Sequence, residues 1–376
     1  MISSTNYRPA LQWSNIEPDD TSPLVIGVLP GEGVGPEVVS SAIRVLENLA
    51  EIQNFQIDIR HGGPIGNDAV RETESSFPKI TQTFCEQIFD EHGALFCGPG
   101  GARFVYMLRE HFDLYCKFTP LVPIKELDNI GPVKQTASKG VDIEVVRENI
   151  AGLYFGEGGH VTEANGDILA YHRLEYRLTQ INRILDVSAR LASLRRGRLA
   201  IVLKAEGIPV ISKLWLQAVE RLRDETKLDL EILDIDNSVY QLIADAHRFD
   251  VIVTSNMFGD VLSDCGSLLL GSRGLSYSGN FGPEGKAAYQ TGHGAAYDIA
   301  GMGMANPVGQ LLSLSMMLEQ SFGRFDSAAV IRDSIVETVR QGHRTIDMTR
   351  TSNKYLTTVE FTDHVINNLR TLANRR

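Results

Sequence analysis

Two aspartates spaced four residues apart are the clearest candidates in this sequence for a chemical role. Asp260 and Asp264 follow an apolar run at 251–253 that predicts a buried parallel strand. If a helix begins after that strand, both carboxylates project from one face, about one turn apart. Two like charges this close favour a cation between them, and oxygen ligands suit Mg²⁺ or Mn²⁺. The alternative is one carboxylate stabilised by the helix dipole and a second in solvent.

Further motifs, in order along the chain, resemble the β-decarboxylating dehydrogenases, the family of the isopropylmalate, isocitrate, homoisocitrate and tartrate dehydrogenases. Residues 256–264, Asn-Met-Phe-Gly-Asp-Val-Leu-Ser-Asp, resemble the family's metal-binding signature. The resemblance runs from about residue 24 to residue 347 and includes 30–37, 108–109, 113–115, 146–149, 152–154, 293–294, 298–301, 305–307 and 342–347. It implies NAD-dependent oxidative decarboxylation of a malate substituted at C3, with Mg²⁺ or Mn²⁺, as in the isopropylmalate dehydrogenases.

Strand-like and helical segments alternate along the chain, which predicts an α/β fold. Strands are predicted at 24–29, 94–97, 141–146, 199–203, 230–235 and 251–253, helices at 38–50 and 174–197, and a hairpin or protruding arm within 152–166. The resemblance implies a two-lobed isopropylmalate dehydrogenase-like fold with a largely parallel sheet and flanking helices. It places 23–117 and 272–376 in a cofactor-side lobe and 118–271 in a lobe for dimerisation, substrate and metal.

The resemblance also assigns the catalytic groups and makes the chain a homodimer with shared active sites. Lys204 follows the strand at 199–203 and would take the hydroxyl proton in the neighbouring subunit's site. A lysine at a strand end can be partly desolvated, which lowers its pKa and makes it a usable base. Tyr154 would protonate the enol after decarboxylation. Asp236 would be a third metal ligand given across the dimer, with nearby Asp234 as its rival on the same predicted strand face.

Two arginines are candidates for the substrate carboxylates, because a guanidinium is a planar fork that matches a carboxylate. Arg109 and Arg147 lie in two of the family-like segments, although on spacing alone each is an ordinary surface ion-pair partner. The residues before Arg109 correspond to the segment that sets substrate specificity in the family. Here this segment carries Arg103, Val105 and Tyr106, a pattern of neither the isopropylmalate nor the isocitrate type.

The candidate cofactor loop lies in the second half of the chain, at residues 293–306. A carboxylate at Asp298 could accept bonds from the ribose hydroxyls of NAD and would repel the extra phosphate of NADP. Family members that use NADP tend to carry Lys-Tyr where this chain has Asp298 and Ile299. The resemblance adds His293, Gly294 and Asn306 to the cofactor site. The alternative for Asp298 is a helix cap or turn residue.

Departures from the family pattern are found at Glu32, Thr119, Glu206, Gln290 and Tyr297. Thr119 replaces an arginine that helps to bind the malate portion of the substrate, and the direction of the possible replacement Lys117 depends on whether this segment is a strand. One alternative is therefore a paralogue for a malate with an anionic substituent, such as a homoisocitrate-like carboxylate or a phosphonate, which Arg103 would bind. Another is a catalytically weak regulatory subunit.

Bulk composition excludes some classes of function. The chain has 376 residues, 43% hydrophobic and 22% charged, with a net charge of −11, which argues against a nucleic-acid partner. No apolar run approaches the length of a membrane span. Four cysteines without a CxxC pair favour a reduced, cytoplasmic protein. Residues 1–22 are polar, lack the features of a signal or transit peptide, and are predicted to be a flexible arm.

Overall fold

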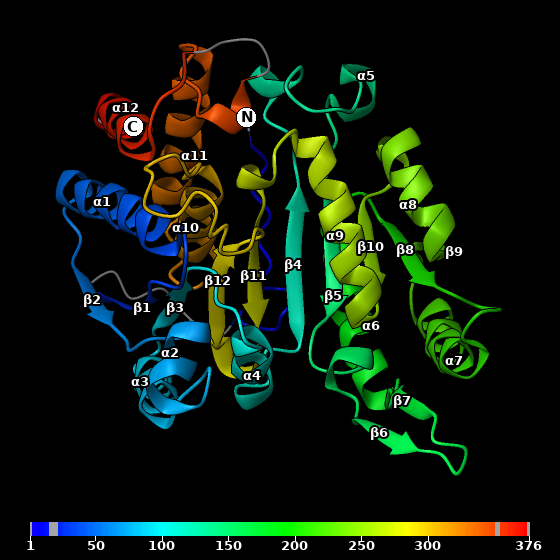
Figure 1. The fold of residues 1–376 in the computed structure, drawn as a ribbon. Coiled ribbons are helices and arrows are strands. Elements are labelled where there is room, and N and C mark those ends of the chain that lie inside the picture. Colours follow the sequence, from blue (N-terminus) through cyan, green and yellow to red (C-terminus); the bar gives the residue numbers. More distant parts are fainter. Residues whose placement is uncertain (1, 15–21, 350–353, 374–376) are drawn as a thin grey trace.

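A computed structural model describes residues 2–14, 22–349 and 354–373 of the chain. Its main feature is a ten-stranded sheet in the order β2-β1-β3-β12-β11-β4-β5-β10-β8-β9 (Figure 1). Neighbouring strands are antiparallel only in the middle, at β12–β11, β11–β4 and β4–β5, and parallel toward both edges. The predicted α/β fold with a largely parallel sheet is confirmed.

The strands and helices have the following bounds. The strands of the large sheet are β1 Leu24–Leu29, β2 Ile57–His61, β3 Ala94–Cys97, β4 Cys116–Leu121, β5 Ile143–Glu148, β8 Arg198–Leu203, β9 Asp229–Asp234, β10 Val251–Thr254, β11 Tyr277–Phe281 and β12 Ala287–Thr291. The helices are α1 Gly35–Gln53, α2 Gly66–Thr73, α3 Lys79–Asp90, α4 Phe104–His111, α5 Gln135–Ser138, α6 Leu178–Ser193, α7 Pro209–Glu225, α8 Ile235–Ala244, α9 Asn256–Leu270, α10 Val308–Gln320, α11 Phe325–Arg340 and α12 Thr358–Ala373. Short 3₁₀ turns are η1 Lys125–Leu127, η2 Leu153–Phe155, η3 Ala246–Arg248, η4 Arg273–Leu275, η5 Pro283–Gly285 and η6 Ile346–Met348.

Local sequence accounts for the element boundaries. Pro36 lies in the first turn of α1, where its missing N–H and fixed φ suit a helix start, and Asn54 ends that helix in the left-handed conformation. Gly271 ends α9 with φ +92, a value that favours glycine. The predicted strand at 141–146 is shifted to Ile143–Glu148, and the predicted helix at 174–197 is shorter, Leu178–Ser193.

The helices cover both faces of the sheet. On one half of the molecule α10 packs on β11 and β12, α1 and α11 pack against α10, and α12 packs against α1 and α11 (Figure 1). On the other half α9 packs on β4 and β5, while α6 packs on β5, β8 and β10. The C-terminal ends of β5, β8 and β10 therefore meet the start of α9, which positions the candidate metal ligands. The two-lobed division remains a proposal, and its predicted boundary at 117–118 falls within β4.

A separate hairpin projects from the body of the protein at the lower right of Figure 1. It consists of β6 (Gly158–Thr162) and β7 (Ile168–His172), which pair antiparallel. Its residues are almost all exposed. The predicted protruding arm is thus present, a few residues later in the chain than the stretch that predicted it.

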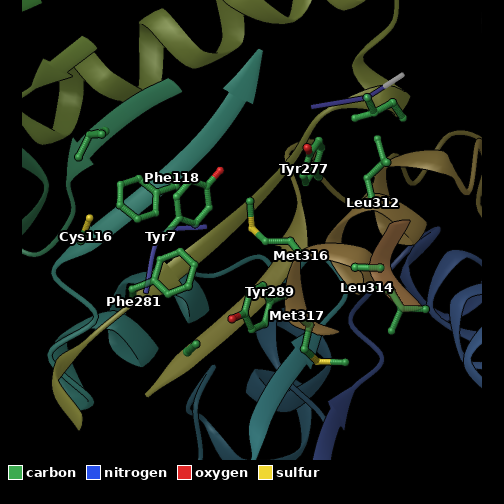
Figure 2. Close-up of a cluster of buried hydrophobic side chains, with 14 of the residues drawn as sticks. Tyr7, Cys116, Phe118, Tyr277, Phe281, Tyr289, Leu312, Leu314, Met316 and Met317 are labelled. Atoms are coloured by element: carbon green, nitrogen blue, oxygen red, sulfur yellow. The ribbon is translucent and has the colours of Figure 1, made fainter. Parts of the chain in front are cut away.

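The prediction of a flexible arm at 1–22 is wrong for residues 2–14. Tyr7 is 2% exposed, and its hydroxyl donates to the carboxylate of Glu144 at 2.6 Å. Figure 2 shows its ring beside Phe118 and Phe281, with ring centroids 4.2 and 6.0 Å away. Ala10, Leu11 and Trp13 are buried in the same core, because these apolar side chains are spaced to cover the middle of the sheet. Residues 1 and 15–21 lie outside the described ranges.

No helix in residues 2–14, 22–349 and 354–373 is both long and apolar enough to cross a membrane. The four cysteines are free thiols, and three of them are buried: Cys85, Cys97 and Cys116.

Candidate active site

The two aspartates of the opening motif lie on one helix, as predicted. Asp260 and Asp264 are on α9, which begins directly after β10. Glycine at 259 lets this helix approach β5, because a Cβ there would lie 2.7 Å from Cγ of Arg147. Arg147 forms an ion pair with Asp260, and Arg273 forms another with Asp264 at 2.8 Å. Each candidate metal ligand is therefore balanced by an arginine.

The side chain of Arg147 is held in place by Asn256, at the start of the same helix. Its side chain is 2% exposed, and its Nε and Nη2 donate to Oδ1 of Asn256 at 2.9 and 2.7 Å. Asn256 is itself fixed, since its Nδ2 donates to the carbonyl of Ala151 at 3.0 Å. One guanidinium nitrogen remains for Asp260. The predicted substrate arginine and the predicted metal ligand thus lie in direct contact.

Tyr154 completes this cluster from η2. Its hydroxyl donates to Oδ2 of Asp260 at 3.0 Å. Burial and the charge of Asp260 raise the pKa of Tyr154 to about 12, so the phenol stays protonated and can donate a proton. Partial burial acts to raise the pKa of Asp260, but the charges of Arg147 and Lys117 outweigh it and hold that pKa below its ordinary value. Asp260 is therefore ionised, as a metal ligand must be.

The second predicted arginine approaches from α4. Arg109 is 4% exposed, and its Nε donates to Oδ1 of Asn280 on β11 at 3.2 Å. Burial and the charge of Arg147 lower the pKa of Arg109 to about 9. Its guanidinium carbon lies 5.7 Å from the centre of the Tyr106 ring, which packs edge-on against Tyr154 at 5.6 Å. Arg109 is thereby joined to the α9 cluster through an aromatic pair.

Arg103 lies at the N-terminal end of the same helix, in a left-handed conformation with φ 65. Its guanidinium carbon is 4.8 Å from the centre of the Tyr106 ring, and its Nη2 donates to the carbonyl of Tyr154 at 2.9 Å. Val105 differs, because it packs against the buried cluster that contains Phe104 and Leu108. Of the predicted specificity residues, the structure therefore brings Arg103 and Tyr106 to the Tyr154 cluster.

Lys204 and Asp236 form a separate pair on the surface. Nζ of Lys204 lies 2.7 Å from Oδ1 of Asp236 and 3.4 Å from Oδ2 of Asp234. The predicted lowering of the Lys204 pKa is wrong within this chain, because the hydrogen bond with Asp236 raises that pKa. The shared strand face of the two aspartates is also wrong, since β9 ends at Asp234 and Asp236 is in the first turn of α8. Asp234 accepts the N–H of Ala205 at 3.0 Å, which leaves Asp236 as the more exposed carboxylate.

The residues of the predicted cofactor loop surround an open pocket of about 460 Å³. His293, Gly294, Ile299 and Asn306 line it, together with Val34 of the 30–37 loop. Burial lowers the pKa of His293, so its imidazole is neutral at neutral pH. Other lining residues are Ser272, Arg273, Gly274, Ala296, Met304, Ala305, Ile346 and Asp347. Asp298 is exposed beside the pocket and is not among its lining residues.

The 30–37 loop and the cofactor loop are in close contact. Gly33 has φ +59, and a Cβ there would lie 1.9 Å from the carbonyl oxygen of Ala295, so only glycine fits. The N–H of Val34 donates to that same oxygen at 2.8 Å. Glu32, one of the departures, is buried and accepts the N–H groups of Gly101 and Asp68. Its carboxylate fixes the loop, which explains how glutamate is accommodated here.

Sequence reasoning missed several residues that organise the site. Arg273 contacts Asp264 and also lines the cofactor pocket, so it connects the two halves of the site. Asn280 accepts from Arg109 and from Asn149, and Asp347 accepts from Asn306 at 2.9 Å. Asp347 lies in a family-like segment and could have been found by that signal. Arg273 and Asn280 carry no local signal, because only the tertiary fold brings them to the site.

The acidic residues fit a hard divalent cation. Among the described residues no group of three His, Cys, Asp or Glu side chains could hold a metal ion, so a cation bound at Asp260 and Asp264 would need further ligands. Substrate oxygens and a carboxylate of a second chain are the available sources. Oxygen donors of this kind suit Mg²⁺ or Mn²⁺ rather than softer metals.

The chain is similar to known dehydrogenases over most of its length. A family profile described as Isocitrate/isopropylmalate dehydrogenase matches residues 25–365. The chain is 36% identical to a 3-isopropylmalate dehydrogenase of Aquifex aeolicus over 93% of this chain and 98% of that one. It is 34% identical to one of Bacillus subtilis over 90% and 95%. A crystal structure of isocitrate dehydrogenase from Methylococcus capsulatus superposes with a TM-score of 0.81 at 27% identity, over 92% of this chain and 99% of that one.

Proposed function

Because the chain belongs to the isocitrate/isopropylmalate dehydrogenase family, and is thus a β-decarboxylating dehydrogenase, we propose that it oxidises and decarboxylates a malate substituted at C3, using NAD and Mg²⁺ or Mn²⁺. The observation that supports this most directly is the contact of Arg147, Asp260 and Tyr154. A cation for a substrate carboxylate, a ligand for a metal and a proton donor lie within one hydrogen-bonded cluster.

Each residue of the cluster has a role in this reaction. Arg109 and Arg147 bind and orient the substrate carboxylates. Asp260 and Asp264, with Asp236 of the partner subunit, would hold the divalent cation. When bound, NAD would supply the hydride acceptor and the cation would supply Lewis acidity.

Two proton transfers complete the reaction. Lys204 of the partner subunit takes the proton of the C2 hydroxyl as the alcohol is oxidised to a ketone. The bond between C3 and its carboxyl group then breaks, CO₂ leaves, and the electron pair remains in the enolate. Tyr154, which is protonated in this site, delivers a proton to C3.

A homodimer with shared sites is supported by two features of the chain. Lys204 and Asp236 form an ion pair at the surface, with side chains 33% and 71% exposed, so that they are available to a second copy. The β6–β7 hairpin exposes large apolar side chains, which favour burial against another surface: Val161, Ile168, Leu169 and Tyr171.

The choice of NAD rests on Asp298 and Ile299. Asp298 lies exposed beside the pocket that Ile299 lines, where its charge would repel the 2′-phosphate of NADP.

A second candidate substrate is a malate with an anionic C3 substituent. Arg103 is joined to Tyr106 and Tyr154 at the edge of the substrate cluster, where its guanidinium could pair with such a group. The intact Arg147, Asp260 and Tyr154 cluster argues against a purely regulatory subunit.

The test is turnover of the purified protein, measured by NADH absorbance on isopropylmalate, isocitrate, homoisocitrate, tartrate, malate and phosphonomethylmalate. We expect activity only with a divalent cation. We also expect a preference for NAD over NADP of about tenfold or more, which corresponds to about 1.4 kcal/mol of repulsion between Asp298 and the 2′-phosphate of NADP. Asp298→Lys with Ile299→Tyr should move the preference toward NADP.

Arg103→Ala separates the two substrate classes. It should lower kcat/KM more for an anionic substituent than for the isopropyl group. No turnover of any of these acids with either cofactor would reject the proposed reaction, and a native preference for NADP would reject the role of Asp298.

A further inference from the structure

We propose that Lys117 binds a substrate carboxylate together with Arg109 and Arg147, and so replaces the cation that is missing at Thr119. This inference rests on the proposed function, because it names the residue that recognises the acidic substrate. It follows from the register of the central strands.

Lys117 lies in the middle of the antiparallel part of the sheet. On β4 it is directly opposite Arg147 of β5 on one side and Asn280 of β11 on the other. Residues that are directly opposite in adjacent strands project to the same face, with Cβ atoms about 5 Å apart. The three side chains therefore form a row across β11, β4 and β5.

Both neighbours in this row belong to the candidate site. Arg147 contacts Asp260, and Asn280 accepts the Nε hydrogen bond of Arg109. The Lys117 side chain thus lies between Arg147, one substrate arginine, and Asn280, which holds the other, Arg109. The strand assignment, which the sequence left open, settles its direction: Lys117 points into the site.

The amino group of Lys117 is buried close to the two substrate arginines. The residue is 8% exposed, and within the described parts of the chain no hydrogen bond or ion pair reaches Nζ. Burial and the charges of Arg109 and Arg147 lower the pKa of Lys117, although Asp260 and Asp264 act in the opposite direction. Its charged form is therefore disfavoured beside the two guanidinium groups, and a bound anion would stabilise it. A dicarboxylate is such an anion.

Thr119 shows why a replacement is needed. It lies on the same face of β4, two residues further along, which is about 7 Å. It is 2% exposed, and its hydroxyl has no hydrogen-bond partner among the described residues. A short neutral side chain at this depth cannot neutralise a carboxylate, whereas the longer Lys117 side chain starts nearer to Arg147.

Direct binding tests this role without turnover. We would titrate racemic malate into the protein without NAD, by calorimetry, and separately measure KM and kcat. Lys117→Met should weaken malate binding by about 10- to 100-fold, the range for loss of a charge-assisted hydrogen bond, and should raise KM more than it lowers kcat. Lys117→Arg should keep most of the affinity.

A compensating variant distinguishes recognition from packing. Lys117→Met with Thr119→Arg should recover a large part of the lost affinity, because a cation returns to the same face. Lys213→Met, at an exposed position of α7, is the matched control and should bind malate normally. If Lys117→Met does not fold, as judged by circular dichroism, Lys117→Gln supplies the second uncharged side chain.

The outcomes separate this inference from the proposed reaction. Normal malate affinity and KM in both uncharged variants would overturn the role of Lys117, even if the protein oxidises an acid from the substrate panel. Equal loss in the compensated double variant would also overturn it, because the defect would then be structural. Weaker malate binding in a protein that turns over none of the acids would reject the reaction and retain the binding role.

Discussion

The substrate cluster and the Lys204 pair are built in opposite ways, although both are proposed to serve one reaction. Arg147 is almost completely buried, with three hydrogen-bonded contacts to α9. The side chains of Lys204 and Asp236 are 33% and 71% exposed and mainly contact one another. The buried cluster is fixed by the fold of one chain. The exposed pair has its groups in place but no substrate site of its own.

This difference indicates where the proposed dimer would need its second subunit. A buried arginine held by an asparagine is preorganised, so it binds a carboxylate without further ordering. A lysine that is one-third exposed and pairs with an exposed aspartate acquires the environment of a catalytic base only when another surface covers it. The shared-site dimer is the arrangement in which both regions can act together.

The largest expected effect comes from the buried side. Asp260→Asn should lower kcat by at least roughly a thousandfold. A neutral amide binds the divalent cation more weakly, and the Lewis acidity of that cation is worth several kcal/mol. Removal of divalent cations with a chelator should have the same effect on the unmodified protein, and Mg²⁺ or Mn²⁺ should restore activity. Full activity in chelator would contradict the metal assignment.

Mixed dimers test whether the two regions meet across subunits. Lys204→Ala should lose about 10²- to 10⁴-fold in kcat, as expected for a lost general base, and Asp264→Ala should be similarly impaired. After subunit exchange between these two variants, one of the two sites in each heterodimer should contain both intact groups and regain activity.

The matched control mixes Asp264→Ala with Tyr154→Phe. Both changes lie in the same half of the site, so no heterodimer contains a complete site and no activity should return. If exchange is confirmed by mass spectrometry and neither mixture recovers, the two regions do not form a shared site.

The smallest effect is on stability and sharpens the contrast between buried and exposed groups. Arg147→Met should lower the free energy of unfolding by about 1–3 kcal/mol, because Oδ1 of buried Asn256 loses its two donors. Lys204→Met should leave the unfolding midpoint unchanged, since exposed ion pairs add little. Urea denaturation of the two variants measures this difference, and equal destabilisation would contradict it.

Local patterns were sufficient to predict part of the site. The β-branched run before Asn256 and the four-residue spacing of Asp260 and Asp264 specify a strand followed by a helix face, and the structure has both. The spacing of apolar residues also identified the helix at 178–193, but neither of its ends. Such features depend on neighbours within a few turns of the chain.

Other parts of the site depend on contacts that no local pattern contains. The direction of Lys117 follows from the pairing of β4 with both β5 and β11, and Arg273 reaches Asp264 only because the chain turns after α9. Asp236 was misplaced because the change from strand to helix at residue 235 lacks a glycine or proline signal. The raised pKa of Lys204 follows from that same change.

The packing of residues 2–14 has a consequence for how the protein is made. The N–H of Tyr7 donates to the side chain of Gln320 at 2.8 Å, across 313 positions of sequence. At about 5–20 residues per second, a ribosome needs roughly 15 to 60 s to synthesise that interval. The Tyr7 N–H therefore lacks this native partner through most of translation. The N-terminal segment, although synthesised first, can complete its packing only after α10 has emerged.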